Sequence, residues 1–182
     1  RKLQETVITN YSGKECQFIH GDCNELLEII NEYNWYKNNW RGVIFLDPYA
    51  MNLKWTTLQS IVKTKVFDVW YLFPLSALNR NLYRNGRIPF NNKKAISDLL
   101  GTDDWEEKIY RISPQGTLFG EIDRDKLPIT EIRQYVIKRL ETEFVGVSKH
   151  AKLLKNPENN SPLFLLCFAV SNPSRNAISR AL

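Results

Sequence analysis

An acid, a proline and an aromatic residue stand together at the end of one apolar run. The run is Gly42 to Leu46, and Asp47, Pro48 and Tyr49 follow it directly. A short continuous apolar run is typical of a strand covered on both faces, as in a parallel sheet between helices. Ligands of such sheets bind outside the carboxyl ends of the strands. The sequence therefore predicts a carboxylate, a rigid carbonyl and a ring at a binding crevice. The alternative is that Asp47 caps the next helix and that Tyr49 packs.

The elements that must position this loop follow from the apolar periodicity. Strands are predicted at 16–20, 42–46 and 67–73, with helices at 26–36 and 55–63 between them. Short links between alternating strands and helices favour parallel pairing with right-handed crossovers. Two strand-like runs near the C-terminus, 145–154 and 163–171, flank a loop rich in Asn and Pro and predict an antiparallel hairpin. The fold class is therefore α/β, with a mostly parallel sheet and a C-terminal antiparallel hairpin.

The middle of the chain is less regular. Helices are predicted at 75–83, 93–100, 103–112 and 130–144, with further short helices at the two termini, 1–10 and 173–182. The breakers Pro114, Gly116, Gly120 and Pro128 indicate a loop at 113–128. We interpret residues 1–182 as a single domain with a mainly helical insertion at about 75–128.

Composition sets further limits. No stretch approaches the ~20 apolar residues of a membrane span, and the N-terminus lacks the apolar core of a secretion signal, so we expect a cytoplasmic protein with no membrane partner. Cys16, Cys23 and Cys167 share no metal-ligand spacing and the chain has 2 histidines, so we expect reduced thiols and no metal. The net charge of +5 weakly favours an anionic partner.

An acid follows each of the first two predicted strands, and this pattern resembles the class I S-adenosylmethionine-dependent methyltransferase fold, which is Rossmann-like. Within that fold, three strings look like the three-Cys-motif partner (TcmP) family: Phe45 to Met51 followed by Trp55, Asp68 to Pro74, and Asn79-Arg80. The similarity covers about residues 15–171. It implies a methyltransferase-like protein that transfers a methyl group from S-adenosylmethionine to a nucleic acid or another acceptor.

The resemblance also implies roles for individual residues. Asp22 and Cys23 match the acidic loop in which such enzymes contact the adenine of the cofactor, through the carboxylate and the next backbone N–H. A buried purine edge needs one such acceptor and one such donor. Asp22 is equally placed to cap the helix that starts near Cys23.

Asp47-Pro48-Tyr49 resembles the Asp-Pro-Pro-Tyr loop of enzymes that methylate exocyclic amines of nucleic acid bases. There the acid and a proline carbonyl orient the target nitrogen and the ring stacks on the base. This chain has one proline between the acid and the ring, which displaces Tyr49 by one position. Arg80 is placed to pair with a phosphate or a substrate carboxylate, or to form a surface salt bridge.

The start of the chain departs from the methyltransferase pattern. No Gly-x-Gly occurs in the sequence, and Arg1-Lys2-Leu3 looks like the helix that follows the second strand of the fold. We therefore expect this fragment to lack the first two strands and not to hold the cofactor alone.

Two other functions compete with methyl transfer. Basic clusters at 63–65, 80–87, 93–94 and 149–155 favour a non-catalytic scaffold that binds nucleic acid or a partner protein. The clustered acids at 103, 104, 106 and 107 would suit a hydrolase or nuclease, but helix capping and the helix dipole suffice to explain them. Trp35, Trp40, Trp70 and Trp105 are expected to pack in the core.

Overall fold

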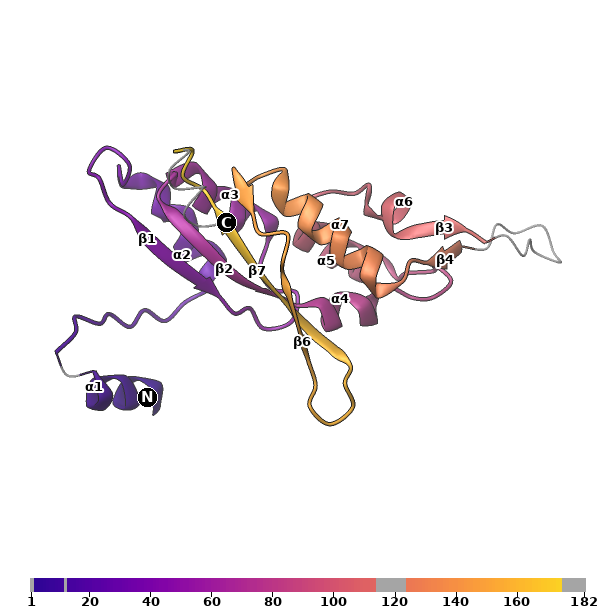
Figure 1. The fold of residues 1–182 in the computed structure, drawn as a ribbon, viewed down its shortest axis with the longest axis horizontal. Coiled ribbons are helices and arrows are strands. Elements are labelled where there is room, and N and C mark those ends of the chain that lie inside the picture. The colour runs from indigo at the N-terminus through magenta and orange to yellow at the C-terminus, as the bar shows by residue number, and fades with distance from the viewer. Residues whose placement is uncertain (1, 12, 114–123, 175–182) are drawn as a thin grey trace.

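The computed structural model describes residues 2–11, 13–113 and 124–174, and shows a mixed α/β fold (Figure 1). Helices and strands alternate from η1 to α4, as the periodicity predicts, but α1 and α2 follow each other with no described strand between them. The elements are α1 (Lys2–Asn10), α2 (Cys23–Glu28), the 3-10 helix η1 (Ile29–Glu32), β1 (Gly42–Leu46), α3 (Trp55–Thr64), β2 (Phe67–Phe73), α4 (Leu75–Asn81), α5 (Phe90–Leu100), α6 (Trp105–Ile109), β3 (Tyr110–Ile112), β4 (Arg124–Lys126), α7 (Ile129–Glu141), β5 (Gly146–Val147), β6 (Lys152–Lys155) and β7 (Pro162–Val170).

The main sheet has the strand order β1-β2-β7-β5, and β6 also pairs with β7. β1 and β2 are parallel, whereas β2, β5 and β6 all run antiparallel to β7. The predicted parallel pair and C-terminal hairpin are thus confirmed, but the sheet is mixed and not mostly parallel. β5 and β6 lie along one edge of β7, so the predicted strand at 145–154 is interrupted between them.

The predicted strand at 16–20 is absent. These residues are exposed and have no regular structure. A strand needs a neighbour to satisfy its backbone N–H and C=O groups, and no described strand pairs with this segment. α1 is found where a helix was predicted, and Figure 1 shows it apart from the sheet.

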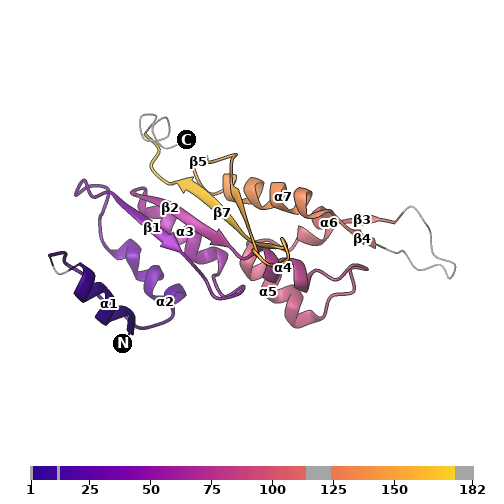
Figure 2. The same ribbon diagram turned by 60° about the horizontal axis from the view of Figure 1, so that its bottom comes forward.

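Within the described chain, helices cover only one face of the sheet. Ile44, Val69 and Phe73 point to that face and pack in a single apolar core with α3, α4, α5 and α7. Figure 2 shows α2 and α3 beside the β1–β2 pair and α4 and α5 beyond its end. On the other face Val43 and Phe45 are 66% and 60% exposed. The prediction that 42–46 is covered on both faces is therefore wrong for the described chain.

Several helices are shorter than the periodicity predicts. The helix predicted at 26–36 is α2 followed by η1, and it ends at Tyr33, whose backbone is extended. The helix predicted at 103–112 is only α6, because Tyr110–Ile112 leave it to pair with β4. The predicted loop at 113–128 contains the short strand β4. Residues 114–123 of this loop, and most of the predicted helix at 173–182, lie outside the described residues.

Trp55 fixes the start of α3 in the core. Its side chain is 2% exposed and its indole N–H donates to Glu143 Oε1 at 2.9 Å. Gly101 ends α5 beneath the indole with a φ of 66°, and a Cβ there would lie 2.1 Å from the ring. Only glycine fits this position, because it combines a left-handed backbone with a direct contact. The loop between β1 and α3 is therefore held firmly at its α3 end.

Candidate functional site

The structure brings the two acids singled out in the sequence to one pocket. Asp22 precedes α2 and Asp47 follows β1, and both line a cavity of about 580 Å³. Cys23, Lys54 and Asp98 line it as well. We call this cavity the acidic pocket. Its size lies within the range of small-molecule sites, which is roughly 300–1,000 Å³.

Asp22 serves as a helix cap and still presents a free oxygen. Its Oδ1 accepts a hydrogen bond from the backbone N–H of Asn24 at 2.9 Å, which caps α2. The capping interpretation is therefore confirmed. Its Oδ2 accepts no hydrogen bond from a described residue, and the backbone N–H of Cys23, at the first helical position, has no intrahelical partner. Capping and ligand contact are thus compatible at this residue.

Asn24 holds Asp22 and the loop after β1 together, a role that the sequence did not reveal. Its side chain is 5% exposed. The Nδ2 group donates to Asp22 Oδ1 at 3.0 Å and to the Asn52 carbonyl at 2.9 Å. The Oδ1 atom accepts from Lys54 N at 2.9 Å and from Thr57 Oγ1 at 2.7 Å. Every donor and lone pair of this amide is used, so it joins α2 to the start of α3.

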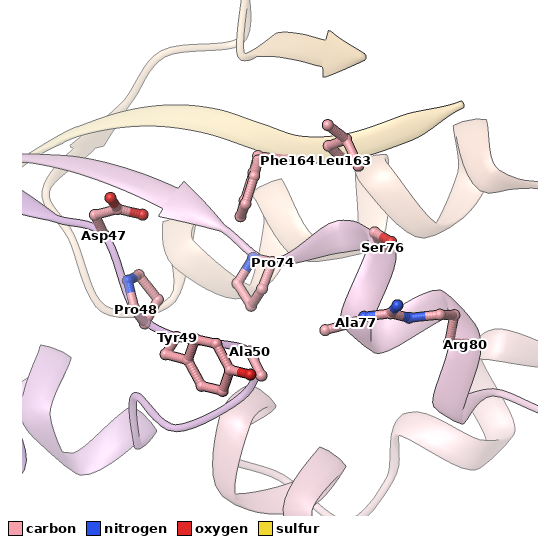
Figure 3. Close-up of a pocket in the computed structure, with 10 residues that line it drawn as sticks. All are labelled: Asp47, Pro48, Tyr49, Ala50, Pro74, Ser76, Ala77, Arg80, Leu163 and Phe164. Atoms are coloured by element: carbon pink, nitrogen blue, oxygen red, sulfur yellow. The ribbon is translucent and has the colours of Figure 1, made fainter. Parts of the chain in front are cut away.

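A second pocket lies on the other side of the same loop. It has a volume of about 440 Å³ and lies between Asp47 to Ala50 on one side and Pro74 to Arg80 on the other. Figure 3 shows Phe164 of β7 closing it and the Arg80 guanidinium extending towards it from α4. We call this cavity the arginine pocket. Asp47, Pro48 and Tyr49 line both pockets and form the wall that the two share.

The side chains of this shared wall are not used for packing. Tyr49 is 87% exposed. Asp47 accepts no hydrogen bond from a described residue, and the residue at the N-cap of α3 is Lys54. The alternatives in which Asp47 caps the helix and Tyr49 packs are therefore wrong. The turn that follows places Ala50 at a φ of 50°, a backbone conformation that costs a residue with a Cβ about 1 kcal/mol or more.

Arg80 is held in place through its neighbours on α4. It is exposed and forms no ion pair with a described residue, so the salt bridge weighed from the sequence is not observed. The Lys126 ammonium donates to Asn79 O, Asn79 Oδ1 and Leu82 O at 2.9 to 3.2 Å. Burial lowers the pKa of Lys126. The end of α4 that carries Arg80 is thereby tied to β4.

A buried hydroxyl lies near the acidic pocket. Tyr71 of β2 is 2% exposed, and its hydroxyl has no hydrogen-bond partner among the described residues. Burial raises the pKa of Tyr71 above its usual range, and the thiols of Cys167 and Cys23 add to this shift. The phenol is therefore neutral and can donate a hydrogen bond.

No three His, Cys, Asp or Glu side chains in the described ranges lie together in a way that could hold a metal ion. All three cysteines are free. Among the described helices, none is long and apolar enough to cross a membrane. Comparisons with known protein families, with curated proteins and with solved structures found no match for this chain.

Proposed function

We propose that this chain belongs to a methyltransferase-like protein of the three-Cys-motif partner family, which methylates an amine on a planar, anionic acceptor such as a nucleic acid base. The observation that carries the proposal is the wall shared by two pockets. Asp47, Pro48 and Tyr49 face both cavities. A group-transfer reaction needs its two substrates held side by side in a fixed orientation.

The charges of the two pockets suit two different ligands. Asp22, Asp47 and Asp98 line the acidic pocket, and Lys54 is the one basic residue among its described lining residues. Asp98 also pairs with Lys94 at 3.1 Å. A carboxylate-rich cavity favours a cation, and S-adenosylmethionine carries a sulfonium. Arg80 in the arginine pocket favours an acceptor that carries a phosphate or carboxylate.

The residues of the acidic pocket fit the adenine end of S-adenosylmethionine. The free Oδ2 of Asp22 would accept from the adenine amino group, and the N–H of Cys23 would donate to a ring nitrogen. The bound cofactor supplies the methyl group and its positive charge. We assign no residue to the methionine end, because the sequence contains no glycine-rich turn.

The arginine pocket fits the acceptor. The Asp47 carboxylate and the Pro48 carbonyl would accept hydrogen bonds from an amino group and direct its lone pair towards the acidic pocket. Tyr49 and Phe164 supply aromatic surface on which a base can stack, and Arg80 supplies a partner for an anionic group. Catalysis by these residues consists of positioning and electrostatic stabilisation.

A transfer assay on the complete protein tests this proposal. It would follow the labelled methyl group of S-adenosylmethionine into mixed single-stranded nucleic acid for wild type, Asp47→Asn and Asp125→Asn. Loss of one orienting group of this kind costs about 10²- to 10³-fold in kcat. We expect that loss for Asp47→Asn and none for Asp125→Asn, which changes an exposed carboxylate on β4. Equal activity of all three proteins would remove Asp47 from the reaction.

A further inference from the structure

A third pocket lies at the opposite end of the parallel strands. It has a volume of about 260 Å³ and is lined by residues 31 and 33–37, which precede β1, and by Lys63, Thr64 and Lys65, which precede β2. Asp47 follows the carboxyl end of β1, so the strand separates this pocket from the candidate site. We call it the aromatic pocket.

The aromatic pocket is built on a fixed indole and offers exposed rings. Trp35 is half-buried and meets Tyr33, Phe67 and Trp40 edge-on, with ring centroids 4.5, 5.6 and 6.4 Å away. Around it, Tyr33 is 47%, Tyr36 45% and Trp40 55% exposed. The prediction that Trp40 packs in the core is therefore wrong. Large rings that stay half in water on a rigid support are typical of recognition surfaces.

The described lining of this pocket carries only positive charge. Lys37, Lys63 and Lys65 belong to it, and no carboxylate among the described residues does. The Arg41 guanidinium lies 5.2 Å from the centroid of the Tyr36 ring, so a further cation covers one face of that ring. The amides of Asn31 and Asn34 complete the lining with donors and acceptors.

We propose that the aromatic pocket binds single-stranded nucleic acid, with one base against Tyr36 and the neighbouring phosphates on Lys63 and Lys65. Proteins that bind single strands combine stacking on aromatic side chains with a basic groove that follows the backbone. A duplex hides its base faces within the stack, so the exposed rings select a single strand. Binding at this site does not require methyl transfer, because no described residue lines both this pocket and the candidate site.

The test measures fluorescence anisotropy of a labelled octathymidylate at several salt concentrations. Wild type should bind, and the logarithm of its affinity should fall linearly with that of the salt concentration. Lys63→Gln/Lys65→Gln should lower the slope of this line by about 1.4, because each lost phosphate contact on a single strand contributes about 0.7. The matched control Lys108→Gln/Lys138→Gln removes the same charge from exposed positions on α6 and α7, outside the basic clusters, and should keep the wild-type slope.

Two variants of one ring separate stacking from charge. Tyr36→Ala should weaken binding about tenfold, within the range of stacking losses, and Tyr36→Phe should bind like wild type. Thermal unfolding of each variant checks that the fold is kept. Absence of binding by wild type, equal losses in the two lysine pairs, or equal affinity of Tyr36→Ala and Tyr36→Phe would overturn the proposal. Because the transfer assay with Asp47→Asn reads a different site, either proposal can fail while the other stands.

Discussion

Replacing Asn24 by alanine should be among the most destabilising single changes in this chain. The side chain makes four hydrogen bonds from a buried position between α2 and the start of α3. Two of its partners, Lys54 N and Thr57 Oγ1, are donors that would lose their acceptor. Thr57 is 0% exposed, so water cannot replace the amide there without a rearrangement.

The size of the effect follows from these contacts. Each lost hydrogen bond contributes about 1 kcal/mol net, so the four together give about 4 kcal/mol. A domain has a free energy of unfolding of only about 5–15 kcal/mol. Thr57→Val removes one hydroxyl at nearly constant volume, so a double-mutant cycle with Asn24→Ala should return a coupling energy of about 1 kcal/mol.

Urea unfolding at 25 °C measures these free energies. Asn38→Ala is the matched control, because Asn38 also donates to a backbone carbonyl, at 3.0 Å, but is exposed. We expect it to change the free energy of unfolding by less than about 0.5 kcal/mol. If Asn24→Ala does not fold, Asn24→Asp provides a milder test. It keeps the acceptor but faces the Asp22 carboxylate, so its stability should recover relative to wild type as pH falls towards about 4. A loss below about 1 kcal/mol for Asn24→Ala would refute the reasoning.

Three further predictions concern titratable side chains. Burial raises the pKa of Asp68, so the charged carboxylate destabilises the native state at neutral pH. Asp68→Asn should therefore raise the free energy of unfolding at pH 7 but not in acid, and a gain that is independent of pH would contradict this prediction. Burial raises the pKa of Cys167 and of Tyr110 to about 12, so the native state keeps these protons to a higher pH than the unfolded chain does. The free energy of unfolding measured in urea should therefore fall as pH rises from about 9 towards 12, and a flat pH profile would contradict the burial of these two groups. Lys126→Met keeps the apolar stem but removes three hydrogen bonds to Asn79 and Leu82, and it should lower the free energy of unfolding in urea by about 1–3 kcal/mol. An unchanged unfolding midpoint would show that these hydrogen bonds do not hold α4 in place.

Local sequence patterns were sufficient to predict those strands and helices whose structure is determined by their own residues. The apolar run 42–46, the run 67–73 and the C-terminal hairpin appear as strands, and their pairing placed Asp47 at the end of β1. The sequence also pointed to Asp22, which lines the acidic pocket, and to Arg80, which lines the adjoining arginine pocket. What these side chains do there stays a prediction.

The misses share one cause, which is the dependence of structure on partners far along the chain. Residues 16–20 have the composition of a strand, but no described strand lies beside them to pair with. Tyr110–Ile112 continue a helical sequence pattern but form a strand, because they pair with β4. The role of Asn24 depends on Asn52, Lys54 and Thr57, which are 28 to 33 residues away. Asn24 precedes Leu27 by three residues and so lies on the face of α2 that packs inward, which was the one local sign of this role.

A calorimetric titration of S-adenosylmethionine into the complete protein tests the central claim most directly, that Asp22 and Asp47 open onto one pocket for a cationic cosubstrate. Asp22→Ser retains a good helix cap and removes the free carboxylate oxygen. Wild type should bind, and Asp22→Ser should bind about 10-fold or more weakly, the loss expected for a hydrogen bond to a charged group. Absence of binding by wild type, or equal affinity of the two proteins, would contradict the claim.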